Sequence, residues 1–410
     1  MSTIPGVFNS TGLKSTQDLT ALSFDKMITR LMPNGTAPLF ALTSYLTAET
    51  AVQTEHGYFA KTALFPYFVL ASAINSTDTE FTVDSTENII EGMIFQLNNT
   101  AKENVLIEAV ISDTVVRVRR AMGGTAGSAA IDISAFMVGN AYEEASIRPT
   151  ALNITPKRIT NLTQIFRNTW ALSGTVQATS VIAGDTPTSE SKQDCAALHA
   201  QSIEAALFFG KKYEGVRKGQ PFRTMDGLIS IISDINNYPE SYTQPNVWNA
   251  GATTNFTQLE GFLDPVFNQT TDPKVANERV LFVGGKARSV LNNIGRLNST
   301  YDITNGETSY GLQFNTFKTS RGTFRMIEHP LFNSNPIWAK SAVCVDLSSF
   351  RMAYLGGRKT QNKEFNTEGM SAQDFGIDAV GGTLTTECTA LVKNPPANAI
   401  ITNLTAAAQG

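Results

Sequence analysis

Cysteine is scarce in this sequence, with three residues among 410. Cys195, Cys344 and Cys388 lie far apart along the chain, so we expect no disulfide framework. Each of them falls in a segment with helix or strand character. This placement predicts buried thiols that contribute to packing.

Histidine is equally scarce, and neither His56, His199 nor His329 has a second ligand at the spacing of a metal site. We expect His199, on a long predicted helix, to be a core or interface histidine with satisfied hydrogen bonds. The sequence lacks the Gly-x-Ser-x-Gly turn of a hydrolase, and the pair Glu143 and Glu144 is typical of a solvated loop rather than of a glycosidase. We therefore predict no catalytic residues, no metal and no cofactor, and a protein that is not an enzyme.

Long apolar runs are also missing, since none approaches the roughly 18 residues of a membrane span. The first residues lack the basic region and apolar core of a signal peptide, so we expect a soluble protein made inside the cell. The net charge of −4 argues against a dedicated nucleic-acid binder, which needs a strongly basic face. It leaves weak contact with nucleic acid open.

Residues 155–215 combine a long extended run with a long helix. Large side chains occupy even positions of the run, at Leu162, Phe166, Trp170 and Leu172. This alternation predicts a half-buried strand, although Gln164 and Asn168 interrupt it. The length of the strand is typical of an arm, and we expect its partners to lie on other chains.

A helix is predicted over residues 187–209. Thr186 is suited to cap it, Pro187 to occupy its first position, and Gly210 to end it in a left-handed conformation. Most of its circumference is apolar and rich in Ala, with one polar stripe at Asp194, Gln201 and Glu204. We expect a rigid spine about 35 Å long.

Three further regions precede this helix. Residues 1–44 mix Gly, Pro, Ser and Thr with short apolar pieces and predict an extended N-terminal arm. Residues 45–67 and 141–185 predict a second extended arm whose two sides pair as a hairpin. Between them, residues 68–140 contain short strands and turn residues at the spacing of a small β barrel or sandwich, which we interpret as an inserted β domain.

From residue 278 onward, apolar runs and one helical pattern predict an αβ module. Gly284, Gly285 and Lys286 open that helix after a strand, as in a phosphate-binding loop. Val280 and Ala287 stand where the motif needs a glycine and a magnesium-binding Ser or Thr. The sequence therefore does not predict a phosphate site.

A basic cluster follows the long helix, with a local charge of +4, and consists of Lys211, Lys212, Arg217, Lys218 and Arg223 around the single acid Glu214. Such a cluster is typical of a solvated loop or of an inter-subunit surface with ion pairs. The alternative is a nonspecific patch that faces phosphate groups.

Four sequence motifs occur in a recognisable order together with the arm, the inserted β domain, the helix and the αβ module. They are AsnLeuThrGlnIlePheArg with LeuSerGlyThr (161–175), PheGlyLys (209–211), ArgThrMetAspGlyLeu (223–228) and AsnProProAlaAsnAlaIleIleThrAsnLeu (394–404). On these residues the sequence resembles the major capsid proteins of tailed bacteriophages, in particular the family with a β insertion before the first motif.

The resemblance implies an α+β fold of the Hong Kong 97 type. Its parts would be an N-terminal arm (1–44), an E-loop (45–67 and 141–185) carrying an inserted β-barrel-like domain (68–140), a peripheral domain with the spine helix (186–274 and 340–410) and an axial domain (275–339). The implied function is that of a major capsid protein. It would self-assemble through hexamers and pentamers, in the host cytoplasm, into an icosahedral virion head that encloses a double-stranded DNA genome.

The partners implied are other copies of the chain, a portal, a decoration protein and packaged DNA. The basic cluster would then be a lumenal patch. No charged helical prodomain is evident at the N-terminus, so we expect a separate scaffolding protein. On the extended arm we expect the subunit interface at Lys157, Arg158, Gln164 and Arg167.

Two alternatives remain. An encapsulin-like nanocompartment shell of the same fold would enclose an enzyme cargo instead of a genome, and the contents of purified particles distinguish the two. A carbohydrate-binding or adhesin protein would use the β insertion to bind a glycan, and would be a monomer.

Overall fold

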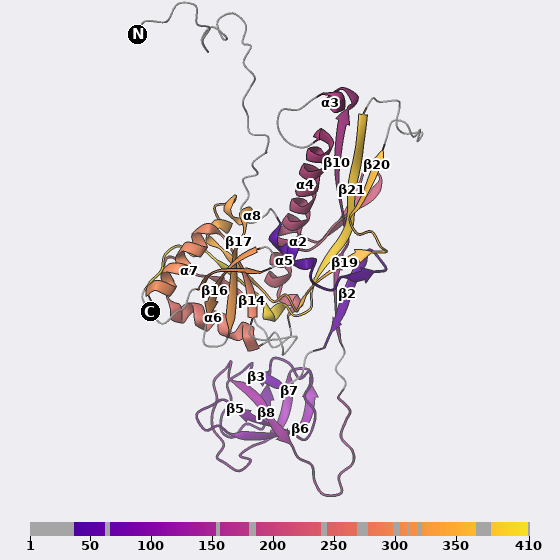
Figure 1. Ribbon diagram of the computed structural model, residues 1–410. Helices are drawn as coiled ribbons and strands as arrows, with labels where there is room; N and C mark the ends of the chain where they lie inside the picture. Colours follow the sequence, from indigo (N-terminus) through magenta and orange to yellow (C-terminus); the bar gives the residue numbers. More distant parts are fainter. Residues whose placement is uncertain are drawn as a thin grey trace, which may run out of the picture. The chain divides into compact units, whose positions relative to one another are not determined.

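The computed structural model describes ten segments of the chain, namely residues 37–61, 66–152, 156–179, 186–238, 244–268, 278–297, 304–309, 312–318, 322–365 and 379–408. Residues 1–36, most of the predicted N-terminal arm, lie outside them. The chain divides into two compact units (Figure 1). The smaller unit is Phe59–Arg158, and the larger one combines Ile159–Gly410 with the chain before Phe59.

The larger unit contains a seven-stranded sheet with the strand order β13-β22-β18-β14-β17-β16-β15. Its strands are β13 (Val247–Asn249), β14 (Glu278–Val283), β15 (Thr304–Ser309), β16 (Leu312–Lys318), β17 (Thr323–Glu328), β18 (Ala342–Val345) and β22 (Ala399–Thr402). Strand β14 is parallel to β17 and antiparallel to β18. Strands β13, β18 and β22 lie outside the range 275–339 predicted for the axial domain, so the sheet is assembled from a wider part of the chain.

Both faces of this sheet are covered, since successive residues of β14 point to opposite sides. Phe282 packs in a core cluster with Ile203 of the long helix, while Leu281 packs in a second cluster with Leu291. The helices of the second cluster are α6 (Phe256–Asn268) and α7 (Gly285–Leu297). A strand buried on both faces has a nearly continuous apolar sequence, as the buried run that ends β14 illustrates.

A five-stranded sheet lies in the same unit and includes the predicted extended run. Its strands are β1 (Glu49–Ala51), β10 (Gln164–Ser173), β19 (Phe350–Leu355), β20 (Gln361–Phe365) and β21 (Ala379–Val392). Strand β10 is antiparallel to β21 along its whole length, from the pair Gln164 and Cys388 to the pair Ser173 and Ala379. The prediction that the partners of this strand lie on other chains is therefore wrong for this edge.

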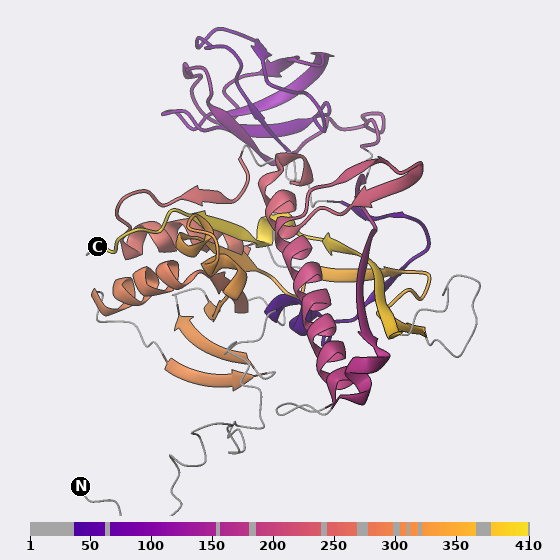
Figure 2. The same ribbon diagram turned by 90° about the horizontal axis from the view of Figure 1, so that it is seen from above.

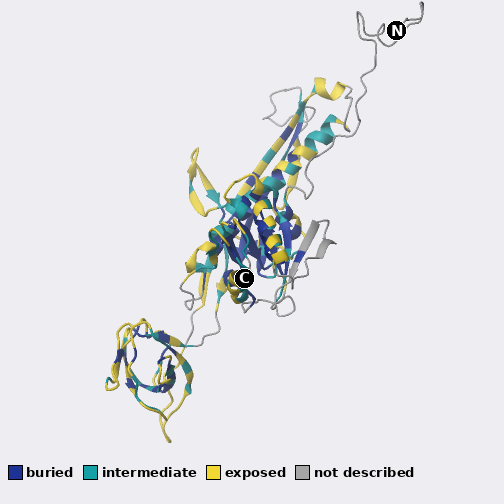
Figure 3. Ribbon diagram, turned by 90° about the vertical axis from the view of Figure 1, so that its left-hand side faces the viewer, coloured by how far each residue is buried: buried dark blue, intermediate teal, exposed yellow. Residues whose placement is uncertain are grey.

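The long helix, α4 (Pro187–Phe209), lies along the face of β10 (Figure 1). The remaining short elements of this unit are α2 (Pro38–Thr43), α3 (Gly174–Ala178), β11 (Tyr213–Arg217), β12 (Gln220–Thr224), α5 (Leu228–Ser233), α8 (Pro330–Asn333) and three 3-10 turns (Ile235–Asn237, Trp338–Lys340 and Pro395–Ala397). Burial is greatest near the centre of the unit, and the distal parts of α3 and α4 are mostly exposed or half-buried (Figure 3).

The polar residues that interrupt the apolar alternation of β10 bind other parts of the unit. Asn168 Oδ1 lies 2.8 Å from His199 Nδ1, and His199 Nε2 lies 2.7 Å from Thr386 Oγ1 on β21. His199 is buried, and burial lowers the pKa of its imidazole. This confirms the prediction of a core histidine with satisfied hydrogen bonds.

The start of α4 agrees with the sequence, but its end does not. Thr186 Oγ1 accepts a hydrogen bond from Ser189 N at 3.4 Å, and Pro187 occupies the first turn. Gly210 has φ −55° and ψ 151°, so the predicted left-handed end is wrong. A glycine is required there by close packing instead, because a Cβ atom would lie 2.6 Å from the carbonyl oxygens of Ala206 and Met225.

The smaller unit has a six-stranded sheet with the strand order β3-β8-β5-β6-β7-β4. Its strands are β3 (Tyr67–Val69), β4 (Glu80–Thr82), β5 (Met93–Leu97), β6 (Asn104–Ser112), β7 (Val115–Arg119) and β8 (Ser134–Asn140). A bridge between Leu70 and Val83, which follow the two edge strands, joins the edges and closes the sheet. Its core includes Phe68, Phe81 and Phe95.

Two strands lead into and out of the smaller unit. They are β2 (Glu55–Ala60) and β9 (Lys157–Leu162), which form a two-stranded sheet. They correspond to the predicted pairing of two extended regions, over a shorter length than predicted. Gly57 allows the close approach, because a Cβ atom there would lie 2.2 Å from Ile159 O.

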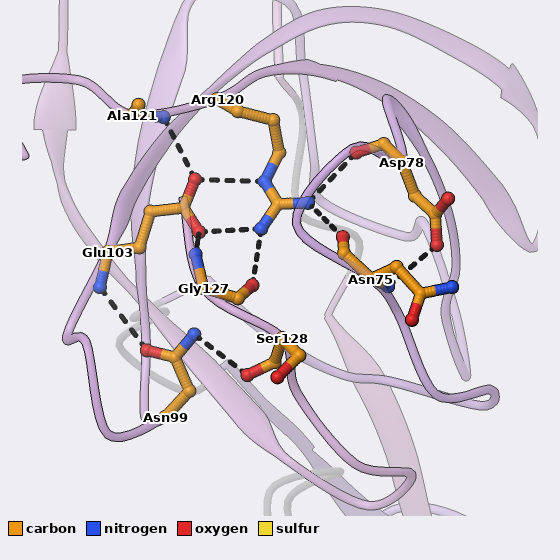
Figure 4. Close-up of polar contacts among 8 residues, drawn as sticks. All are labelled: Asn75, Asp78, Asn99, Glu103, Arg120, Ala121, Gly127 and Ser128. Atoms are coloured by element: carbon orange, nitrogen blue, oxygen red, sulfur yellow. Dashed lines mark hydrogen bonds and ion pairs between the residues drawn. The ribbon is translucent and has the colours of Figure 1, made fainter. Parts of the chain in front are cut away.

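Loops of the smaller unit are held together by a buried ion pair (Figure 4). The Arg120 guanidinium binds both carboxylate oxygens of Glu103, at 2.8 and 2.7 Å. It also donates to Asn75 O at 2.7 Å and to Gly127 O at 2.6 Å. The carboxylate in turn accepts the backbone N–H groups of Ala121 and Gly127. Three loops thus converge on one pair of opposite charges.

The network determines the protonation of Glu103. Burial alone would raise the pKa of its carboxyl group, but the hydrogen bonds from Arg120 and from the amides of Gly127 and Ala121 outweigh burial and lower it. The charged form is therefore the one that folding favours. Its stabilising contribution is present above the ordinary pKa and is lost as the pH falls through the lowered pKa of the folded state.

We predict that Glu103→Gln destabilises the smaller unit by about 3 kcal/mol or more, because it leaves the buried Arg120 charge uncompensated. The matched control is Glu80→Gln, which removes an exposed ion pair with Arg117 and costs about 1 kcal/mol at most. Urea unfolding at neutral pH, followed by circular dichroism, measures both. Equal effects of the two substitutions would contradict a structural role for the network.

Candidate assembly surfaces and the junction that positions them

The first and third motifs of the sequence, 161–175 and 223–228, meet next to the end of α4. Asn161 Nδ2 donates to Asp226 O at 2.9 Å and to Ala390 O at 2.7 Å, and Asn161 Oδ1 accepts from Asp226 N at 2.8 Å. Three residues further on, Gln164 Oε1 accepts from Met225 N at 3.1 Å. We call this set of contacts the motif junction. It fixes strands β9 and β10 against the segment that follows β12.

A buried carboxylate extends the motif junction to β21. Glu387 Oε1 accepts a hydrogen bond from Thr163 Oγ1 at 3.1 Å, and Glu387 Oε2 accepts one from Arg358 at 2.6 Å. Arg223 NH2 lies 4.0 Å from Glu387 Oε1. Two cations therefore approach a carboxylate that is buried among strands, as the burial of charge requires.

The second motif, PheGlyLys, joins the same place. Gly227 N donates to Gly210 O at 3.1 Å, and Lys212 N donates to Asp226 Oδ1 at 3.0 Å. A Cβ atom on Gly227 would lie 2.7 Å from Ala206 O, so this close approach also requires a glycine. The segment after α4 and the segment before α5 therefore lie in close contact. Residues 213–224, which connect these two segments, form a hairpin.

Strands β11 and β12 pair from Tyr213 and Thr224 to Arg217 and Gln220. The two-residue turn has φ 52° at Lys218 and φ 73° at Gly219, the positive values that hairpin turns need. The hairpin spans residues 213–224. It projects from the C-terminal end of α4 (Figure 2).

The basic cluster lies on and beside this hairpin, but its members differ. Lys211, Arg217 and Lys218 are exposed. Lys212 Nζ donates to Thr160 O and to Thr160 Oγ1, both at 3.1 Å, and half-buried Arg223 approaches Glu387. Two of the five predicted patch residues therefore bind within their own unit.

The four residues predicted for the arm interface lie on two strands. Lys157 and Arg158 are exposed at the start of β9, and Arg167 is exposed on the face of β10 away from α4. Gln164 belongs to the motif junction. Their contribution to a subunit interface stays a prediction.

A second buried carboxylate holds helix α2 against the rest of the unit. Glu204 accepts the backbone N–H groups of Leu39 at 2.8 Å and Phe40 at 2.6 Å, and Glu204 Oε1 lies 2.8 Å from His329 Nε2. His329 Nδ1 accepts from Leu331 N, so the ring proton sits on Nε2 and is donated to Glu204. Glu204, which the sequence places in a polar stripe of the helix, is buried, with an exposed fraction of 0%.

The structure also describes the cysteines and the glycine-rich turn before α7. Cys195, Cys344 and Cys388 are free and buried, as predicted. Where the rejected phosphate loop would bind, Gly285 N donates to Asn333 Oδ1 at 2.6 Å. Among the described residues, no group of three or more His, Cys, Asp and Glu side chains could hold a metal ion, and no helix is long and apolar enough to span a membrane.

Comparison with known proteins gives consistent results. The family model described as SU10 major capsid protein matches residues 8–405. The major capsid protein of Pseudomonas phage PaMx41 is 34% identical over 416 residues, which cover 98% of this chain and 97% of the relative. Two solved structures are similar at low identity. A native GTA particle capsid has a TM-score of 0.47 and 11% identity, covering 98% of this chain and 100% of that one. Mycobacterium phage Adephagia has a TM-score of 0.46 and 9% identity, covering 98% of each chain.

The matched sequence defines a structural protein of a phage virion. The chain belongs to the family of SU10 major capsid proteins. The resemblance stated from the motifs is thereby confirmed.

Sequence reasoning missed several residues that position these surfaces. Asn161 and Asp226 belong to two of the motifs, yet their contact joins positions 65 residues apart. The burial of Glu204 could not be predicted, because a helical period shows a polar residue without showing its partners. A usable signal was present in the polar interruptions of β10, since a polar side chain on a buried face needs a bonding partner.

We predict that Asn161→Ala costs about 3 kcal/mol of folding stability, because it leaves buried backbone groups of Asp226 and Ala390 without hydrogen bonds. Asn293→Ala, at an exposed position of α7 in the same unit, is expected to change stability by about 0.5 kcal/mol at most. Urea unfolding of both variants tests the motif junction. A stable Asn161→Ala protein would show that its contacts are dispensable.

We also predict that Glu204→Gln loosens helix α2, because an amide has one acceptor oxygen for the N–H groups that the carboxylate binds. Hydrogen exchange at the amides of Leu39 and Phe40 should become at least about tenfold faster, which corresponds to about 1.4 kcal/mol. Glu364→Gln, which weakens only an exposed ion pair with Lys192, serves as the control. Unchanged exchange at both amides would refute the anchoring role.

Proposed function

We propose that this major capsid protein self-assembles through hexamers and pentamers into an icosahedral head around a double-stranded DNA genome. The observation that carries the proposal is the family match, which extends over residues 8–405. Self-assembly of one chain into a closed shell requires the same surfaces to meet in related environments. A rigid unit with projecting strands suits that requirement.

The surface of the chain supports self-association. Large apolar side chains are exposed on projecting elements, including Val52 at 88%, Phe59 at 70% and Val216 at 75%. One edge of β10 pairs with β21, and the five-stranded sheet ends at β10 in the described part of the chain. Exposed apolar groups and a sheet edge of this kind mark sites where other chains bind.

The remaining partners follow from the same proposal. A separate scaffolding protein would guide assembly in the host cytoplasm, a portal would occupy one vertex, and a decoration protein would bind the outer surface. Contact between the shell and DNA would be nonspecific, and the net charge of −4 argues that it would also be weak.

We predict that the purified chain, expressed with its scaffolding partner, forms closed particles with fivefold vertices in electron cryo-microscopy. Particles from infected cells should contain double-stranded DNA. Particles that contain an enzyme instead would support the nanocompartment alternative. A chain that remains monomeric at high concentration, both with and without its scaffolding partner, would refute the proposed function.

A further inference from the structure

The β11–β12 hairpin combines exposed aromatic and cationic side chains. Tyr213 and Phe222 lie on one face with their ring centroids 6.4 Å apart, and the Arg217 guanidinium lies 5.9 Å from the centroid of Phe222. Gly215 between them leaves room for this stack, since a Cβ atom would lie 2.5 Å from the Tyr213 hydroxyl oxygen. On the opposite face, Val216 is 75% exposed. We call residues 211–222 the hairpin surface.

This composition fits a protein partner better than a phosphate backbone. Binding to phosphate relies on many unpaired Lys and Arg side chains, but Lys212 and Arg223 are engaged within the unit. Tyr, Phe and Arg are enriched in protein interfaces, and Tyr and Arg are among the residues that contribute most of the binding energy. The remaining exposed cations, Lys211, Arg217 and Lys218, lie around the apolar side chains, as charges do at the rim of an interface.

The backbone of the hairpin also points to a protein partner. Its two strands pair only with each other in the part of the chain that the structure describes. A two-stranded hairpin is marginally stable in water, and its outer edges carry backbone groups that can pair with an extended segment. To match the exposed cations and apolar groups of the hairpin, the partner should offer acidic and apolar side chains.

A segment with such side chains follows β8 in the smaller unit and includes a turn at Glu144 and Ala145. Residues 141–152 are exposed throughout and contain no strand or helix. Glu143 and Glu144 carry two adjacent negative charges, and Ile147 is 89% exposed. Between residues 66 and 152 the chain has eleven acidic and five basic residues, a net charge of −6. We call residues 142–147 the acidic segment.

We propose that the hairpin surface of one copy binds the acidic segment of another copy. The proposal rests on the proposed self-assembly and names one pair of surfaces that would carry it. Arg217 and Lys218 would face Glu143 and Glu144, while Ile147 would cover the apolar side chains of the hairpin. Burial of apolar area would supply affinity, and the charges would set orientation and the rate of association.

Reciprocal charge reversal tests this pairing. One variant carries Arg217→Glu and Lys218→Glu, and the other carries Glu143→Lys and Glu144→Lys. Each variant alone places like charges in contact, so its yield of closed particles should fall at least about tenfold. When the two variants are co-expressed, opposite charges meet in both pairings between unlike copies, and the particle yield should return to within about twofold of the wild type.

The mixture also provides the internal control, since it contains the same substitutions as the two single variants. Its recovery would show that these substitutions do not prevent folding. Circular dichroism of dissociated subunits checks that each variant is folded. A misfolded variant is replaced by its milder form, Arg217→Gln with Lys218→Gln or Glu143→Gln with Glu144→Gln. The milder forms should lower the yield in the same direction, and no loss of yield would overturn the proposal.

Other outcomes separate the remaining possibilities. Failure of the mixture to recover overturns the pairing, and recovery only when all four substitutions share one chain would indicate a contact within a copy. Normal particles that lose DNA would assign the hairpin to nucleic acid instead. If the wild-type chain does not assemble at all, the proposed function fails, which is distinct from failure of this pairing.

Discussion

Strand β10 connects most of the larger unit because its edge and its two faces have different surroundings. One edge is paired with β21, and the face of even-numbered residues is covered by α4. Phe166 and Trp170 supply apolar contact on that face, while Asn168 binds the helix through His199. The other face, which includes Arg167, remains exposed. Moving this strand by one residue would exchange the two faces, so its register constrains everything packed upon it.

The elements themselves were largely predictable from sequence, and their partners were not. The alternation of β10, the N-terminal cap of α4 and the apolar face of α7 all follow from local spacing, which depends on residues a few positions apart. The pair Gln164 and Cys388 is separated by more than half the chain. No periodic pattern encodes such a pairing, so the sequence alone predicts an arm that binds other chains.

Two glycines and one carboxylate show the same limit at the level of single residues. Gly210 follows a helix, and that position usually favours a left-handed conformation. Its actual constraint is the close approach of Met225, a residue that local sequence does not place nearby. Glu204 likewise reads as a solvated residue of a helix, but the N–H groups of α2 and the ring of His329 satisfy its charge inside the core.

The motifs that identified the family mostly stabilise the subunit and do not themselves form its exposed surface. Asn161, Gln164 and Asp226 bind one another's segments, and Gly210 and Gly227 permit the contact between them. These buried hydrogen bonds hold both ends of the β11–β12 hairpin, whose own side chains are exposed and fit no such constraint. Because the ends of the hairpin are held in place and its side chains are exposed, residues on the hairpin can be substituted without loss of the fold. We therefore expect the contacts between subunits to be encoded at positions such as Val216, where packing within the chain leaves the choice of residue open.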